Sequence, residues 1–262
     1  MFLAIIAAGH AEDADHTNHF AAQPPTETEL VSVQVDDGVA RADFAKVKAT
    51  ITNHTDDYLL YKLAESVMHF EHGDYNPNTG LMKGDLVIDP KGSGSRTLEA
   101  SDGEHFHVDA FSIDLTGLYR AADPATDEAP DFQLPASAND FSAGDWNCSL
   151  TGLKQETKET KADFKCTWLG EGLGFASPNK AGIEVEGQTF ANNNKRAKMK
   201  VLRPGDSTKF TLVFNVPAKV ADMQFATMQI QWRDTFSSAA LTAVEVPTIE
   251  LVIDESLTAE KN

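Results

Sequence analysis

The two cysteines of this 262-residue chain limit its possible folds more than any other feature. Cys148 and Cys166 lie at equal distances on either side of Thr157, so a hairpin that turns there places them opposite each other. Directly opposed residues of antiparallel strands have Cα atoms about 4.5–5.5 Å apart, a separation that a disulfide can span. We therefore predict a Cys148–Cys166 disulfide that joins neighbouring strands and indicates export to an oxidising compartment.

Length and charge narrow the class of protein further. A chain of 262 residues can form two domains that each bury a core. Its formal net charge of −18 disfavours nucleic acid and anionic membrane surfaces as partners. Residues 1–140 contain 8 basic and 25 acidic residues and all eight histidines, whereas residues 141–262 contain 14 basic and 15 acidic residues. The two parts of the chain are therefore expected to have chemically different surfaces.

The N-terminal residues resemble an export signal. Phe2–Gly9 is apolar, and Gly9 and Ala11 are small residues at the spacing of a signal-peptidase site. This apolar run is too short to span a bilayer, and we expect no transmembrane segment elsewhere. His10–Glu29 is polar and acidic without periodicity, so residues 1–29 are predicted to be a signal-like, disordered leader.

Strand patterns dominate the remainder of the chain. Val31, Val33 and Val35 alternate with polar residues, as expected of a half-buried strand, and Phe106–Leu115 alternates in the same way. Ala121–Ala138 contains three prolines and reads as an extended linker. The predicted organisation is a β-domain over 30–120, a linker over 121–139, a second β-domain over 140–254 and a tail over 255–262.

The two predicted domains share sequence patterns in the same order. Val87–Gly92 corresponds to Val201–Asp206, and a strand rich in serine and threonine follows each of these turns. Ala42–Phe44 corresponds in the same way to Ala162–Phe164. Each part then ends in an alternating apolar strand, formed by Phe111, Ile113 and Leu115 in one and by Met228, Ile230 and Trp232 in the other. This order favours an internal duplication.

The turn-and-strand segment Arg203–Phe214, together with Met228–Trp232, resembles the immunoglobulin-like β-sandwich modules of exported bacterial proteins. The resemblance implies an all-β fold of two tandem antiparallel immunoglobulin-like β-sandwich domains, and it implies no activity. Antibody-type domains bridge two sheets with their disulfide, whereas the pair predicted here closes a single hairpin.

Catalytic motifs do not emerge from the sequence. It contains no Gly-x-Ser-x-Gly elbow, no phosphate-binding loop and no His-Glu-x-x-His motif. Residues 141–262 contain no histidine, and both cysteines are expected to be paired, which disfavours a Cys–His nucleophile there. The chain is therefore not expected to be an enzyme.

A metal site is the sharper alternative, because histidines and carboxylates are concentrated in two short segments. Imidazole and carboxylate ligands suit Zn²⁺ or Cu²⁺, which need three or four ligands at roughly 2 Å. His105 and His107 would share one face of a strand. The candidate ligands are His69, Glu71, His72, His105, His107 and Asp109. The opposing interpretation is that these are scattered surface histidines.

The leading hypothesis is a non-catalytic exported binding or assembly module, periplasmic or extracellular, that recruits another protein through edge strands and loops. A zinc- or copper-binding protein is the first alternative, and a hydrolase is the second. The sequence leaves the identity of the partner and the oligomeric state open.

Overall fold

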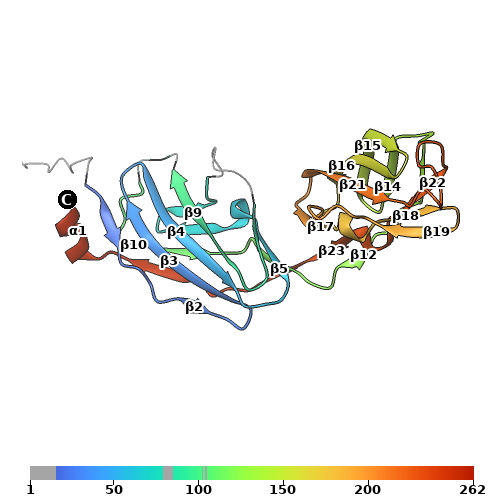
Figure 1. Ribbon diagram of the computed structural model, residues 1–262. Coiled ribbons are helices and arrows are strands. Elements are labelled where there is room, and N and C mark those ends of the chain that lie inside the picture. Colours follow the sequence, from blue (N-terminus) through green and yellow to red (C-terminus); the bar gives the residue numbers. More distant parts are fainter. Residues whose placement is uncertain (1–15, 79–84, 102, 104) are drawn as a thin grey trace, which may run out of the picture. The chain divides into compact units, whose positions relative to one another are not determined.

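The computed structural model describes residues 16–78, 85–101, 103 and 105–262, and these form antiparallel β-sheets with little helix (Figure 1). The predicted all-β class is therefore confirmed. The chain divides into two compact units. Unit 1 comprises residues 1–119 and 243–262, and unit 2 comprises residues 120–242.

Unit 1 contains one long sheet and two shorter ones. The long sheet has the order β1-β3-β4-β9, with β2 also paired to β3. The shorter sheets have the orders β24-β11-β5-β8 and β25-β10-β6-β7. The strands are β1 (Asn18–Phe20), β2 (Thr26–Glu27), β3 (Val31–Ala40), β4 (Phe44–Asn53), β5 (Tyr58–Tyr61), β6 (Val67–Phe70), β7 (Gly73–Tyr75), β8 (Leu86–Ile88), β9 (Ser93–Ser101), β10 (Ala110–Asp114), β11 (Leu118–Ala121), β24 (Leu241–Ala243) and β25 (Ile249–Val252).

Unit 2 repeats this arrangement. Its long sheet has the order β14-β15-β16-β21, and its shorter sheets have the orders β12-β23-β17-β20 and β13-β22-β18-β19. The strands are β12 (Ala125–Thr126), β13 (Phe132–Leu134), β14 (Asp140–Ala143), β15 (Trp146–Glu156), β16 (Glu159–Trp168), β17 (Leu173–Ala176), β18 (Gly182–Val185), β19 (Gln188–Ala191), β20 (Lys200–Leu202), β21 (Ser207–Asn215), β22 (Met228–Gln231) and β23 (Phe236–Ala239). The short helices are η1 (Leu63–Glu65), η2 (Pro178–Lys180), η3 (Arg233–Thr235) and α1 (Glu255–Lys261).

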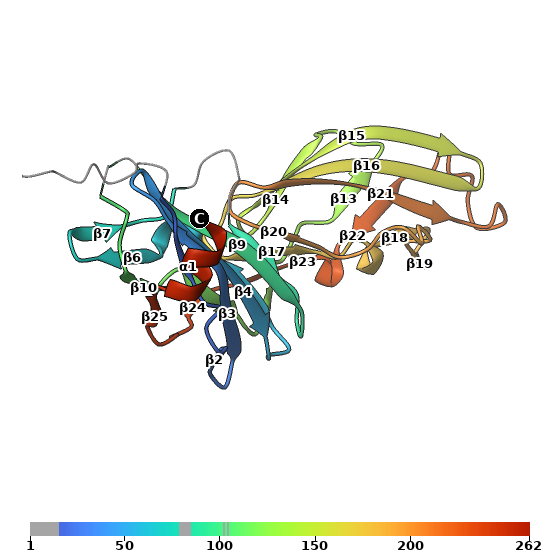
Figure 2. The ribbon, with the colours of Figure 1, turned by 90° about the vertical axis from the view of Figure 1, so that its left-hand side faces the viewer.

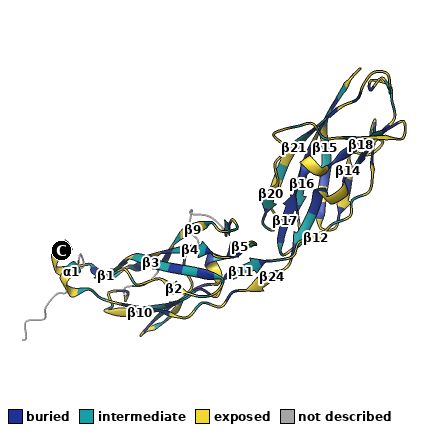
Figure 3. Ribbon diagram, turned by 60° about the horizontal axis from the view of Figure 1, so that its bottom comes forward, coloured by how far each residue is buried: buried dark blue, intermediate teal, exposed yellow. Residues whose placement is uncertain are grey.

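The core of each unit lies between its long sheet and its two shorter sheets. Val31, Val33 and Val35 of β3 are at most 1% exposed and alternate with half-buried residues, as the sequence pattern predicted. These residues belong to the same buried apolar cluster as Met68 and Ile113 of a shorter sheet. Figure 3 shows how burial varies along the strands. Opposed sheets with a shared apolar core are compatible with a β-sandwich.

The predicted repeat is visible in the topology and in local turns. The turns Asp89–Gly92 and Arg203–Asp206 each close with a hydrogen bond between their ends, and each lies between two equivalent strands. The residue after each proline, Lys91 or Gly205, has a positive φ of 55° or 80°. One proposed correspondence is wrong: Phe44 begins β4, whereas Phe164 is the sixth residue of β16. Alternating strands look alike when shifted, so the sequence alone did not define this register.

The last two strands of each repeat belong to the other unit. β12 pairs with β23 and β13 with β22, so the segment predicted as a linker over 121–139 contributes strands to unit 2. β25 pairs with β10, and Val244 bonds to Leu118 of β11, so the end of the predicted second domain over 140–254 completes unit 1. In Figure 1 the red C-terminal strand accordingly lies among the strands of unit 1. The predicted boundaries missed this exchange, because proline-rich edge strands resemble linkers.

Both predicted terminal segments contain regular secondary structure. Residues 1–15 of the proposed leader lie outside the described residues, but β1 and β2 fall within 1–29 and belong to the long sheet. Phe20 is 2% exposed and packs on Phe111, and a Cβ atom at Gly38 would lie 2.8 Å from the Cβ atom of Phe20. The predicted tail over 255–262 forms α1, whose first turn is capped by the side chain of Asp254.

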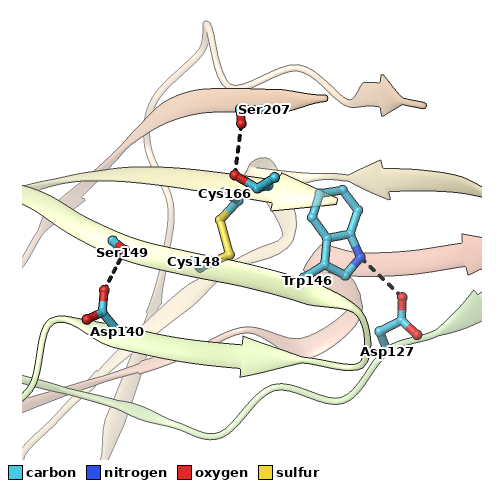
Figure 4. Close-up of a disulfide and its surroundings, with 8 residues drawn as sticks. Asp127, Asp140, Trp146, Cys148, Ser149, Cys166 and Ser207 are labelled. Atoms are coloured by element: carbon cyan, nitrogen blue, oxygen red, sulfur yellow. Dashed lines mark hydrogen bonds between the residues drawn. A yellow bond between two sulfur atoms is a disulfide. The ribbon is translucent and has the colours of Figure 1, made fainter. Parts of the chain in front are cut away.

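The predicted disulfide is present. Cys148 and Cys166 are directly opposite on β15 and β16, with Cα atoms 4.1 Å apart (Figure 4). By strand register, Val33 and Ile51 occupy the same positions in unit 1, and both are buried. One unit therefore uses a covalent bond where the other uses an apolar contact.

Deleting residues 241–262 should unfold unit 1 and leave unit 2 folded. Val244, Ile249 and Leu251 are all buried in unit 1, and losing their burial costs roughly 5–9 kcal/mol, comparable with the stability of a whole domain. All three tryptophans lie in unit 2, so tryptophan fluorescence follows that unit, while amide hydrogen exchange follows unit 1. Deleting only residues 255–262 is the control, with a smaller effect; loss of tryptophan-detected folding in the longer deletion would contradict the assignment.

Reducing the disulfide should destabilise unit 2 selectively, by about 3 kcal/mol for a loop of this size. The expected observation is a lower denaturation midpoint by tryptophan fluorescence, with unit 1 unchanged by hydrogen exchange. Unit 1 serves as the internal control, because Val33 and Ile51 replace the cysteines there. Two free thiols in the unfolded, non-reduced protein would exclude the bond.

Candidate functional site

His69 lies at the centre of a chain of hydrogen bonds that crosses a short sheet of unit 1. Its Nδ1 atom is 2.8 Å from an Asp74 carboxylate oxygen, and its Nε2 atom is 3.0 Å from an Asp114 oxygen. The other oxygen of Asp114 accepts a hydrogen bond from Thr248 at 2.6 Å. The chain therefore connects β7, β6, β10 and the residue that precedes β25.

This environment shifts the pKa values of two of its members. The pKa of His69 is raised above its usual value, chiefly by the hydrogen bond to Asp74. Burial lowers this pKa, and the hydrogen bond to Asp114 raises it. The pKa of Asp114 is lowered, chiefly by the hydrogen bond from Thr248. Burial raises this pKa, and the hydrogen bond to His69 lowers it further. The protonated imidazole between two carboxylates is thus the favoured state at mildly acidic pH.

The other predicted metal ligands form separate pairs. The rings of His72 and His105 lie 6.0 Å apart beside Phe106, and those of His16 and His107 lie 5.5 Å apart. His105 and His107 are both exposed and flank a buried Phe106, but they precede β10 and are not part of a strand, so that expectation was wrong.

The last two predicted ligands have other surroundings. Asp109 accepts a hydrogen bond from the side chain of Asn18, and Glu71 is exposed beside the turn between β6 and β7. Within the described ranges, no group of three or more histidine, cysteine, aspartate or glutamate side chains is placed to hold a metal ion. The structure therefore gives the zinc or copper hypothesis no support.

Unit 2 has a counterpart of the His69–Asp114 pair. Glu184 and Gln231 occupy the equivalent positions on β18 and β22, and the amide of Gln231 donates to Glu184 at 2.7 Å. A polar pair at this site is therefore common to both units, and only unit 1 places an imidazole there. Sequence reasoning selected His69 but not Asp114, because nothing in the spacing of the two residues indicates that β6 and β10 are neighbours.

The outer edge of β15 differs from the equivalent edge in unit 1. β14 pairs with Trp146–Ser149, and Leu150 bonds to Asn139, but no described strand pairs with the outer edge of residues 151–156. Figure 2 shows β15 and β16 extending as a hairpin. In unit 1 the equivalent end of β3 is covered, because Gly38–Ala40 pairs with β1.

Lysines of the long sheet of unit 2 are arranged in like-charged opposed pairs. Lys154 is directly opposite Lys161, and Lys165 is directly opposite Lys209. Glu156 lies 2.5 Å from Lys154, and Glu159 lies 2.8 Å from Lys161. Among the described carboxylates, none lies within ion-pair distance of Lys165 or Lys209. Opposed like charges destabilise a sheet, so an acidic ligand would relieve this repulsion.

Charge remains unequal when it is grouped by structural unit. Unit 1 contains 8 basic and 25 acidic residues, a net charge of −17, whereas unit 2 contains 14 basic and 15 acidic residues, a net charge of −1. Units 1 and 2 therefore have the same net charges as residues 1–140 and 141–262, although strands are exchanged between them. The predicted contrast between the two surfaces holds for the folded units.

Comparisons with known proteins do not place the chain in a family. No protein-family model and no characterised protein matches it. A structure of wild-type BuGH86 in complex with neoagarooctaose aligns at 12% identity and a TM-score of 0.18, over 84% of this chain and 33% of that one. The secreted serine protease VesC from Vibrio cholerae aligns at 10% identity and a TM-score of 0.16, over 78% of this chain and 48% of that one. The chain thus spans a third to about half of these proteins, and TM-scores below 0.5 carry no argument about fold or activity.

Among the described residues, no helix has the length and apolar character needed to cross a membrane.

Replacing His69 by asparagine should destabilise unit 1 most at mildly acidic pH. A raised histidine pKa stabilises the fold below pH 6.5, and this gain is lost as the pH rises through the folded-state value. A lowered aspartate pKa stabilises the fold above about pH 3.8, and this gain is lost as the pH falls through the folded-state value. The largest difference is therefore expected between about pH 4 and 6.5.

The measurement is urea unfolding of the variant and the wild type at pH 5.5 and pH 9, followed by hydrogen exchange in unit 1. The side chains of His69 and Asp114 are 34% and 33% exposed, so solvent screening limits the effect to about 1 kcal/mol or less. The His54→Asn substitution, at an exposed histidine of the same unit, is the control. Equal destabilisation at both pH values would refute an ionised link.

Proposed function

We propose that this protein is a non-catalytic, exported binding module that captures an extended segment of another protein by adding it as a strand to unit 2. The observation that carries the proposal is the uncovered outer edge of β15, at the place where unit 1 has its own covering strand. Strand addition of this kind obtains affinity from backbone hydrogen bonds and specificity from side chains on alternate positions.

The edge also indicates which segment it would accept. Leu153 occupies the position of Gly38 and is 37% exposed, so an incoming strand needs a small residue against it. Lys154, in the middle of the edge, disfavours indiscriminate pairing and favours a partner with an acidic residue opposite. Lys165 and Lys209 lie on the same face of the sheet, and they have no ion-pair partner among the described carboxylates. They add to this preference for an acidic partner.

Export and the immunoglobulin-like architecture belong to the same proposal. The buried Cys148–Cys166 disulfide is typical of proteins from oxidising compartments, which supports a periplasmic or extracellular location. Paired antiparallel sheets around one core in each unit support the assignment to immunoglobulin-like sandwiches. A binding role agrees with His69, whose two ring nitrogens are both engaged by carboxylates and are therefore poorly placed for base catalysis.

The test is photo-crosslinking in cells that produce the protein natively. A photoreactive benzoylphenylalanine in place of Leu153 should give a discrete product with a second protein, and adding Lys154→Glu should reduce its yield several-fold. The same group in place of Leu169, which is 62% exposed in unit 2 and outside β15, is the matched control. Equal or absent products at both positions, or reduced thiols at Cys148 and Cys166 in those cells, would contradict the proposal.

A further inference from the structure

The two repeats fill each other's vacant strand positions in the same register. β13 pairs with β22 through Phe132 opposite Ile230, and β25 pairs with β10 through Ile249 opposite Ile113. The next inward-facing pairs, Leu134 with Met228 and Leu251 with Phe111, also correspond. Each unit therefore contains an acceptor site for two strands, and neither site is filled by its own repeat.

The connections explain why the strands are exchanged. Only Ala240 separates β23 from β24, and the shortest common hairpin loops have two residues. Three residues, Ala122–Pro124, separate β11 from β12. A three-residue hairpin usually ends in a residue with positive φ, which proline cannot adopt. Both connections therefore disfavour folding the last strands back onto their own repeat, and each repeat donates them to the other unit.

The C-terminal arm, defined as residues 241–262, makes the contacts by which unit 1 retains it. Val244, Ile249 and Leu251 enter the core, and Ile253 forms a bridge with Phe20 of β1. The chain end is fastened as well, since the side-chain amide of Asn262 donates to Thr17 and the backbone of Asp254 donates to His19. All of these contacts join the arm to unit 1, and none depends on which chain supplies Ala240.

We infer that unit 1 is a strand-accepting site for the C-terminal arm of a second copy of this chain, so that two copies can form a dimer by exchanging arms. The exchanged and the unexchanged forms contain the same contacts, and they differ in the connection at Ala240 and in the effective concentration of the arm. Short connections that cannot fold back are those that favour such exchange. Raising the protein concentration during refolding shifts the balance toward the dimer.

The test uses directly opposed residues of β10 and β25. Ser112 and Glu250 face each other across the two strands, so cysteines at these positions can form a disulfide. One copy carries Ser112→Cys and the other carries Glu250→Cys; the two are mixed, unfolded without reductant, refolded together at high concentration and then oxidised mildly. The native cysteines are already paired. Unfolding at acidic pH keeps the added thiols protonated, so they do not exchange with the native disulfide.

The expected result is a covalent dimer of the two different copies. The control combines Glu250→Cys with Ser95→Cys, an exposed position of unit 1 on β9, and should give at least about tenfold less product because the bond needs opposed Cα atoms. The yield should rise with refolding concentration. A chain carrying both Ser112→Cys and Glu250→Cys tests folding, since it should form the bond within the monomer. If that chain oxidises readily while the mixture gives no dimer above the control, the inference is overturned.

Discussion

The pairing of donated strands with the centre of each short sheet is the interaction on which the rest of this structure depends. β10 of unit 1 and β22 of unit 2 lie next to a strand that arrives from the other repeat. Without it, each would be an edge with unpaired backbone groups, and the apolar residues behind it would be exposed to water. Each unit therefore needs a segment of the other repeat to complete its sheets, even though each has its own core.

Local sequence patterns predicted those features that depend on short-range geometry. The alternation in β3, the proline turns before β9 and β21 and the opposed cysteines could all be read from neighbouring residues. The unit that a strand joins could not be predicted from neighbouring residues, because β25 has the same alternating pattern whichever unit it joins. The strand β1 was missed for a related reason: three residues in a polar segment are too few to show a period.

The surroundings of the histidines could not be predicted from neighbouring residues either. Their concentration in one part of the chain is real, and His72 and His105 do approach each other. Ligand geometry, however, depends on which strands are neighbours, and β6 lies between β7 and β10 so that His69 is held by carboxylates on both sides. The same polar pair in unit 2, built from Glu184 and Gln231, indicates that this position links neighbouring strands.

The C-terminal arm also affects the order in which the two units can complete their folds during synthesis. A ribosome completes every strand of unit 2 before it has released β24 and β25, although unit 1 begins more than a hundred residues earlier. Unit 1 must therefore wait, with the edge of β10 open, until β24 and β25 emerge. Strand exchange between repeats thus sets an order of completion, in which unit 1 cannot close before the strands that follow unit 2 have been made.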